Sequence, residues 1–188
     1  AQLKKDYEAA GAEVLLLSAG DAIQGTSLVN MGYGEEAVNF MNAAGYDAMV
    51  PGNHEFDWGY ENLKTLEGNM DFPLLAANVV DQNGRQVFTQ YMIYELEDGR
   101  LVGVFGLATP ETATKAHPDK IKGLTFLAGQ ELYDCAQKQV DELRDQGCEL
   151  VIALGHLGVD EESAPNRSTD VLKHVNGIDL FVDGHSHT

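Results

Sequence analysis

Four short apolar runs in this sequence end in the same way, with a glycine followed directly by a side chain that can bind a metal ion. The glycine lets the backbone turn sharply, so the next side chain can point away from the strand. Carboxylate, amide and imidazole groups together suit divalent ions such as zinc, manganese, iron or cobalt. The candidate ligands that follow these runs are Asp21, Asn53, His156, His185 and His187.

The elements that position these residues are predicted as buried strands. An isolated Gly-Asp or Gly-His after a strand is usually only a turn, but four such endings in one chain are difficult to obtain by chance. Ligands in layered α/β proteins bind beyond the carboxyl ends of the strands. We therefore expect the four tips to converge on one metal-binding crevice. The predicted strands span residues 14–17, 48–50, 150–154 and 178–182.

The rest of the chain alternates helical patterns with further strand patterns. Apolar residues at helical spacing predict helices over residues 1–10, 35–44, 60–70, 130–146 and 169–175. Residues 73–80 read as another strand, residues 85–108 as a hairpin around Asp98 and Gly99, and residues 110–123 as a polar loop. This order predicts an α/β domain with strands covered on both faces and with mixed sheets.

The composition excludes some functions. The 188 residues contain 30 Asp and Glu against 12 Lys and Arg, a net charge of −18, which disfavours binding to DNA, RNA or anionic membranes. No apolar run approaches the ~20 residues of a membrane span. Cys135 and Cys148 are too few for a disulfide framework. The chain opens without Met and stops just after a polar cluster, and we expect it to be an excerpt of a longer protein.

Three familiar catalytic motifs are missing. Residues 54–58 begin like the helix motif of zinc proteases, but Trp58 stands where that motif needs its second histidine. The sequence has neither a phosphate-binding Gly-rich loop ending in Lys-Ser or Lys-Thr nor a Gly-x-Ser-x-Gly elbow. Metal-assisted chemistry therefore remains the leading interpretation.

The ordered motifs resemble those of the calcineurin-like metallophosphoesterases. The longer forms are similar to the branch of 5′-nucleotidases and 2′,3′-cyclic-nucleotide phosphodiesterases, and the resemblance extends over residues 1–188. It implies a four-layer α-β-β-α sandwich with mixed sheets, incomplete here at both ends. The matching segments are residues 20–26 (Gly-Asp-Ala-Ile-Gln-Gly-Thr), 52–57 (Gly-Asn-His-Glu-Phe-Asp), 155–156 (Gly-His) and 184–188 (Gly-His-Ser-His-Thr).

The resemblance also implies a role for each residue of the site. Two divalent ions lie close together in that family, and by its motifs Asp21 bridges them. Asn53, His156 and His185 complete the shell of the second ion, and His187 belongs to the first.

The family motif places His54 beside the phosphoryl group, where Asp57 orients it. Two ions about 3.5–4 Å apart can activate water for an in-line displacement. The alternative for His54 is a capped residue at a helix start, and for Asp57 it is the N-cap of the helix that follows.

The function implied by the resemblance is metal-dependent hydrolysis of phosphate esters, with nucleoside 5′-monophosphates as the expected substrates. The alternatives are a phosphodiesterase of 2′,3′-cyclic nucleotides, a related hydrolase of sulfur esters, and a binding module without catalysis. The resemblance further suggests an exported or cell-surface protein.

The family's first Asp-x-His strand, its last strands and its C-terminal substrate domain are not in this sequence. Residues 1–188 are therefore expected to be part of a catalytic domain. We expect this piece to hold one ion well and a second poorly, and to be a weak phosphatase.

Overall fold

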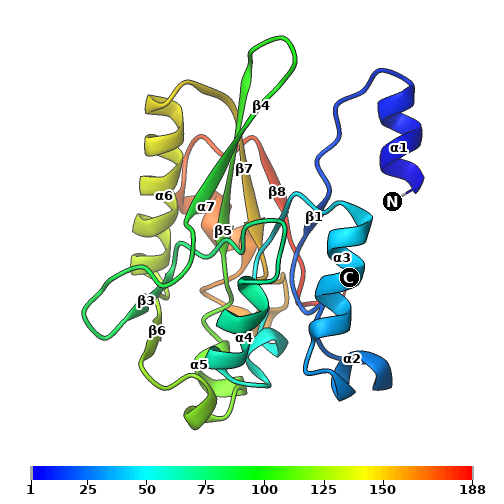
Figure 1. Cartoon of the computed structure of the whole chain (residues 1–188). Coiled ribbons are helices and arrows are strands. Elements are labelled where there is room, and N and C mark those ends of the chain that lie inside the picture. Colours follow the sequence, from blue (N-terminus) through cyan, green and yellow to red (C-terminus); the bar gives the residue numbers. More distant parts are fainter. Residues whose placement is uncertain (1, 188) are drawn as a thin grey trace.

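The computed structural model describes residues 2–187. Its helices and strands alternate along the chain, as expected for an α/β protein (Figure 1). The α-helices are α1 (Gln2–Ala9), α2 (Ser27–Met31), α3 (Glu35–Ala44), α4 (Tyr60–Glu67), α5 (Thr112–Lys115), α6 (Gln130–Asp145) and α7 (Ser168–His174). The strands are β1 (Leu17–Ser18), β2 (Ala48–Met49), β3 (Val79–Asp81), β4 (Tyr91–Glu95), β5 (Leu101–Leu107), β6 (Leu124–Phe126), β7 (Cys148–Gly155) and β8 (Leu180–Val182). Three short 3₁₀ helices are η1 (His54–Phe56), η2 (Pro118–Lys120) and η3 (Glu161–Ser163).

The largest sheet among the described residues has four strands in the order β4-β5-β7-β8. Strands β4 and β5 form the predicted antiparallel hairpin, whereas β5, β7 and β8 run parallel to one another. Strand β7 lies inside this sheet, and from Val151 onward it is apolar and mostly buried. The prediction of a mixed sheet is confirmed.

A second sheet is formed by β1 and β2, which pair in parallel with Leu17 opposite Ala48. The segment after α4 joins the two sheets by changing its partner at each residue. The amide of Leu75 bonds Met49, that of Ala76 bonds Thr89, and that of Ala77 bonds Gly106 in β5. The prediction of one continuous strand over residues 73–80 was therefore too simple, because only Val79–Asp81 forms a ladder, antiparallel to β6.

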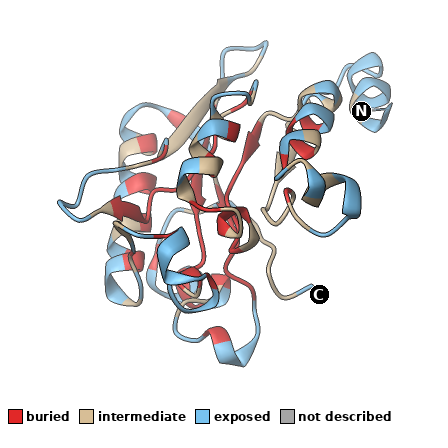
Figure 2. Cartoon of the chain, turned by 60° about the horizontal axis from the view of Figure 1, so that its bottom comes forward, coloured by how far each residue is buried: buried red, intermediate tan, exposed pale blue. Residues whose placement is uncertain are grey.

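Apolar side chains divide the protein into four layers. One core cluster, which includes Val50, Val104 and Leu154, lies between the two sheets. A second packs α3 and α4 against the outer face of β2, and a third packs α6 and α7 against the four-stranded sheet. Figure 2 shows the buried residues concentrated between the helices. The expected order of helix, sheet, sheet and helix is thus confirmed.

Local differences from the predicted elements have simple causes. The strand predicted from residue 14 begins only at Leu17, because Leu16 bonds Asp47 through both its amide and its carbonyl. The polar loop predicted over residues 110–123 contains two short helices, α5 and η2. Neither α2 nor β6 was predicted, since both are too short to show a hydrophobic period.

Candidate metal centre

The segments that follow β1, β7 and β8 meet at one cleft with a volume of about 400 Å³. Asp21 comes from the segment after β1, whereas His156 and His185 follow β7 and β8 of the other sheet. His187 also lines this cleft. Three of the four predicted strand tips therefore line one cleft, and they come from both sheets of the sandwich, whereas Asn53 is not among its lining residues.

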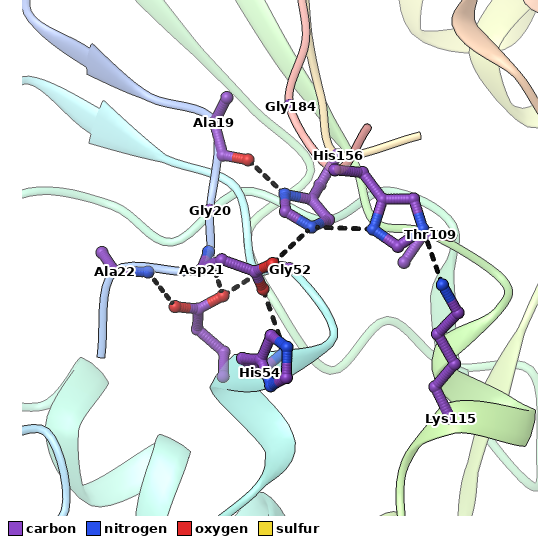
Figure 3. A network of polar contacts seen from close by, with 12 residues as sticks. Ala19, Gly20, Asp21, Ala22, Gly52, His54, Thr109, Lys115, His156 and Gly184 are labelled. Carbon is purple, nitrogen blue, oxygen red and sulfur yellow. Dashed lines mark hydrogen bonds and ion pairs between the residues drawn. The ribbon is translucent and has the colours of Figure 1, made fainter. Parts of the chain in front are cut away.

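Three of the predicted ligands form a compact group. Nε2 of His156 lies 3.1 Å from Oδ2 of Asp21 and 3.2 Å from Nδ1 of His185. One nitrogen or oxygen from each of the three residues lies within 4.8 Å of the other two. Figure 3 shows the His156 ring between Asp21 and Ala19. Their role as metal ligands remains a prediction, but the distances suit a shared cation.

The proton positions of His156 explain why this group favours a cation. Its Nδ1 lies 2.5 Å from the carbonyl oxygen of Ala19, which can only accept a hydrogen bond. Nδ1 therefore carries the proton, and Nε2 of the neutral ring presents a lone pair toward Asp21 and His185. The lone pair on Nε2 and the carboxylate of Asp21 repel each other unless a positive charge lies between them.

Without a metal, a proton supplies part of this positive charge. Burial alone would raise the pKa of Asp21, but hydrogen bonds from His156 and from the amide of His54 lower it overall. Burial disfavours the charged form of His156, yet the neighbouring Asp21 raises the pKa of the imidazole above its usual value. The lowered pKa keeps Asp21 ionised, and the raised pKa of His156 is the effect of that neighbouring negative charge.

Asn53 contributes a second sign of a metal site. The residue is buried, and its Oδ1 has no hydrogen-bond partner within residues 2–187. An unpaired buried polar atom costs about 1–3 kcal/mol. Asn53 directly follows Gly52, which lies against Asp21 and His156. Its other neighbour, His54, donates its amide to Asp21, so an amide oxygen without a partner in this segment fits a ligand for a divalent ion.

The backbone around the group is strained in a way that only tight packing can maintain. Asp21, His185 and His187 all have left-handed backbone angles, with φ of 58°, 80° and 55°. Such angles are uncommon for residues other than glycine and tend to occur at functional sites. A Cβ on Gly52 would lie only 2.2 Å from Oδ1 of Asp21 and 2.7 Å from Nε2 of His156. Glycine is therefore required at this position.

Glu55 holds the loops of the first sheet together, a role that the sequence analysis missed. Its carboxylate is buried and accepts hydrogen bonds from the amides of Asp21, Ala22, Ile23 and Gly52 at 2.6–3.2 Å. Burial and the charge of Asp21 raise the pKa of Glu55, whereas these amides oppose the shift. The strained turn at Asp21 is thus tied directly to the segment that carries Asn53.

The predicted pair of His54 and Asp57 is in contact. Nδ1 of His54 lies 2.7 Å from Oδ2 of Asp57, and the His54 side chain is 45% exposed. The alternative of an N-cap role for Asp57 is wrong, because the residue before α4 is Gly59 and Asp57 ends η1 instead. The His54 amide also donates to Oδ1 of Asp21 at 3.0 Å, which places His54 beside the ligand group (Figure 3).

Other predicted and unpredicted residues complete the site. His187 is exposed and is not one of the three residues in the compact group. Two acidic residues were missed: Asp183, which accepts bonds from the amides of Leu157 and Gly184, and Glu111, whose Oε2 lies 3.1 Å from Nε2 of His185. Burial alone would raise the pKa of Glu111, but hydrogen bonds from Lys115, Ser163 and His185 lower it to about 2.

The whole sequence, residues 1–188, matches the family described as calcineurin-like phosphoesterase. The chain belongs to this family. Like other calcineurin-like phosphoesterases, it is therefore expected to use divalent metals, and the group of Asp21, His156 and His185 is the place in the structure that suits them.

Named relatives and solved structures extend the comparison. A 5′-nucleotidase of Rattus norvegicus is 36% identical over 93% of this chain and 29% of its own length. A snake venom 5′-nucleotidase of Naja atra is 35% identical over 98% of this chain and 34% of its own length. The chain thus spans about a third of these curated relatives. The structure of the Thermus thermophilus sulfate thiohydrolase SoxB with glycerol has a TM-score of 0.87 at 28% identity, over 99% of this chain and 32% of that one.

Within residues 2–187, every helix is too short or too polar to cross a lipid bilayer.

The close contact at Gly52 makes a direct prediction. We expect Gly52→Ala to weaken Mn²⁺ binding at least about tenfold, because the new methyl group would push Asp21 and His156 apart. Isothermal titration calorimetry on the folded variant would measure this. Gly32→Ala is a matched control, since the nearest atoms to its added Cβ lie at ordinary contact distances of 3.7 Å and beyond. Equal Mn²⁺ affinity of the two variants would contradict the proposed placement of the metal centre.

Proposed function

We propose that this protein hydrolyses phosphate esters with the help of divalent cations, and that nucleoside 5′-monophosphates are its substrates. The convergence of Asp21, His156 and His185 carries the proposal, because the family uses divalent metals and these three side chains could hold one. The nucleotide preference is supported by relatives named 5′-nucleotidase at 35–36% identity.

The side chains of the site would divide the work. Asp21, Asn53, His156 and His185 would hold one ion, and Asp21 with His187 would contribute to a second; zinc, manganese, iron and cobalt all suit these ligands. When bound, the cations supply positive charge for phosphate oxygens and a more acidic water. The buried unpaired Oδ1 of Asn53 and the lone pair on Nε2 of His156 support this set.

His54 would act on the phosphoryl group or the leaving oxygen. A carboxylate only accepts hydrogen bonds when ionised, so the 2.7 Å contact with Asp57 holds a proton on Nδ1 and fixes the ring. When Nε2 also carries a proton, the ring can stabilise the departing oxygen or transfer that proton to it. Because the His54 amide is bonded to Asp21, the ring is held at a constant place relative to the metal ligands.

We also propose a larger protein around this domain. Residues 1–188 would be part of the catalytic domain, and a C-terminal domain would bind the nucleoside. The lengths of the relatives support this, since the match covers 29–34% of them. An exported or cell-surface location is proposed too, supported by a relative from snake venom.

A second candidate function is hydrolysis of a sulfur ester. It is favoured by the similarity to the sulfate thiohydrolase SoxB, at a TM-score of 0.87. The same cations and the same His54 would serve a sulfuryl centre, because its oxygens develop similar negative charge. The identity of the substrate therefore has to be measured.

A substrate comparison on the intact protein would decide between these functions. We expect AMP to be hydrolysed with a higher kcat/KM than a 2′,3′-cyclic nucleotide, an aryl phosphate or an S-sulfo thiol ester. Release of phosphate or sulfate, measured in the presence of Mn²⁺, provides the comparison. Preference for the sulfur ester would support the second candidate, and no turnover of any compound would favour a binding module.

The role of His54 can be tested in the same assay. We expect His54→Asn to lower kcat about 10²- to 10⁴-fold, the usual contribution of general acid catalysis, while metal content stays at the wild-type level. His117→Asn is a suitable control, because its side chain is 70% exposed on another loop. Unchanged turnover in His54→Asn would assign the proton transfer to a different group.

The number of ions bound by the 188-residue chain is a separate prediction. We expect one tightly held ion per chain, because four side chains are available for one position and only Asp21 and His187 for the other. Elemental analysis after dialysis against metal-free buffer measures the ratio. Two tightly held ions per chain would show that further side chains of residues 1–188 complete the coordination of the second ion.

A further inference from the structure

A carboxylate lies behind one of the metal-ligand histidines. Oε2 of Glu111 is 3.1 Å from Nε2 of His185, the ring nitrogen that faces away from His156. The His185 side chain is only 8% exposed, so the contact is largely shielded from water. Glu111 follows β5, which is the neighbour of β7 in the sheet. The end of β5 thus reaches the metal centre through a residue outside the ligand set.

The Glu111 carboxylate is itself held in place. Nζ of Lys115, one turn further along α5, lies 2.7 Å from Oε2 of Glu111. The segment before Glu111 is anchored from below, because the buried side chain of Asn78 exchanges two hydrogen bonds of 2.8 Å with the backbone of Ala108. Glu111 is therefore a fixed acceptor rather than a mobile surface group.

Two neighbours compete for Nε2 of His185. Glu111 can only accept a hydrogen bond and so requires a proton on Nε2, whereas Nζ of Lys115, 3.3 Å away, can only donate and requires a lone pair there. The proton on Nε2 leaves the lone pair on Nδ1, which faces His156 and Asp21. The opposite tautomer carries its proton on Nδ1, so that nitrogen has no lone pair for a metal ion.

We propose that Glu111 is a positioning residue that holds His185 in the Nε2-protonated form and thereby presents Nδ1 to the bound cation. This inference rests on the proposed metal centre. Lys115 has a better partner than the ring, since its contact with Glu111 is 0.6 Å shorter than its contact with His185. A carboxylate that accepts from the far nitrogen of a ligating histidine also orients the ring and strengthens its bond to a metal.

A purely structural role makes a different prediction. If Glu111 serves only as the ion-pair partner of Lys115 across one helical turn, removing either side chain should have the same effect. If Glu111 selects the protonation state of His185, its removal should weaken metal binding, whereas removal of Lys115 should not, because the competitor for Nε2 disappears. Glu111 and Lys115 variants therefore separate the two roles.

The experiment measures Zn²⁺ affinity by competition with a chelator for the 188-residue chain and its variants. We expect Glu111→Ala to bind about 10- to 100-fold more weakly than wild type. Glu111→Gln should lose less, because the amide oxygen still accepts from Nε2, and Lys115→Met should remain near wild type. Glu61→Ala, on the exposed face of α4, is the matched control for removal of a glutamate. Thermal unfolding of the metal-free proteins tests whether each variant is folded. If Glu111→Ala does not fold, the Zn²⁺ affinity of Glu111→Gln becomes the deciding measurement.

A spectroscopic readout reports the protonation state directly. In ¹H–¹⁵N correlation spectra of the Zn²⁺-loaded chain labelled at histidine, we expect His185 to carry its proton on Nε2. Metal-free Glu111→Ala should shift toward the Nδ1-protonated form. Suppose that the wild-type chain binds Zn²⁺. Equal losses of affinity in Glu111→Ala and Lys115→Met, or no loss in either variant, would then overturn the positioning role alone. A wild-type chain that binds no Zn²⁺ or Mn²⁺ would overturn the metal centre and this inference together.

Discussion

Electron-rich atoms from separate strands face one another at about hydrogen-bond distance in the cleft, and much of the surrounding structure serves to keep them there. Oδ2 of Asp21 and Nδ1 of His185 lie 3.1 and 3.2 Å from the same nitrogen of His156. A cation between these atoms stabilises the arrangement, and without positive charge there the atoms repel one another. The pKa of His156 is raised because a proton on its ring supplies part of the positive charge that Asp21 attracts.

This constraint explains why two sheets are needed. Asp21 and Asn53 follow strands of the two-stranded sheet, whereas His156 and His185 follow strands of the four-stranded sheet. The apolar cluster between the sheets sets their separation, and the segment from Leu75 to Ala77 bonds both sheets. Loss of packing between the layers would therefore change the distances between ligands, even though the core residues do not touch the site.

Much of the candidate site could be predicted because its residues follow a local rule. A strand, a glycine and a polar side chain are adjacent in sequence, so Asp21, His156 and His185 could be found without knowing which strands are neighbours. The contact between His54 and Asp57 is similarly local, at a spacing of three residues. The alternation of helices with apolar strands predicted an α/β protein with mixed sheets, whereas the four layers were predicted from the family resemblance.

Glu111 and Glu55 could not be predicted in the same way. Glu111 lies 74 residues before His185 in the sequence, and the contact exists only because β5 is placed beside β7. Glu55 stood inside a recognised motif, but its four backbone partners come from two loops that only the fold brings together. Strand order and backbone contacts of this kind have no signal in a single sequence.

The charge of the protein would give the proposed metal centre a second function besides catalysis. A chain with net charge −18 repels phosphate esters, and Asp21 and Asp57 add negative charge at the site itself. Lys115 is already paired with Glu111, so its positive charge is largely neutralised. Bound cations would reverse the local field. In the proposed mechanism the same ions must therefore attract the substrate before they can activate it, which makes metal binding a condition for substrate affinity as well as for turnover.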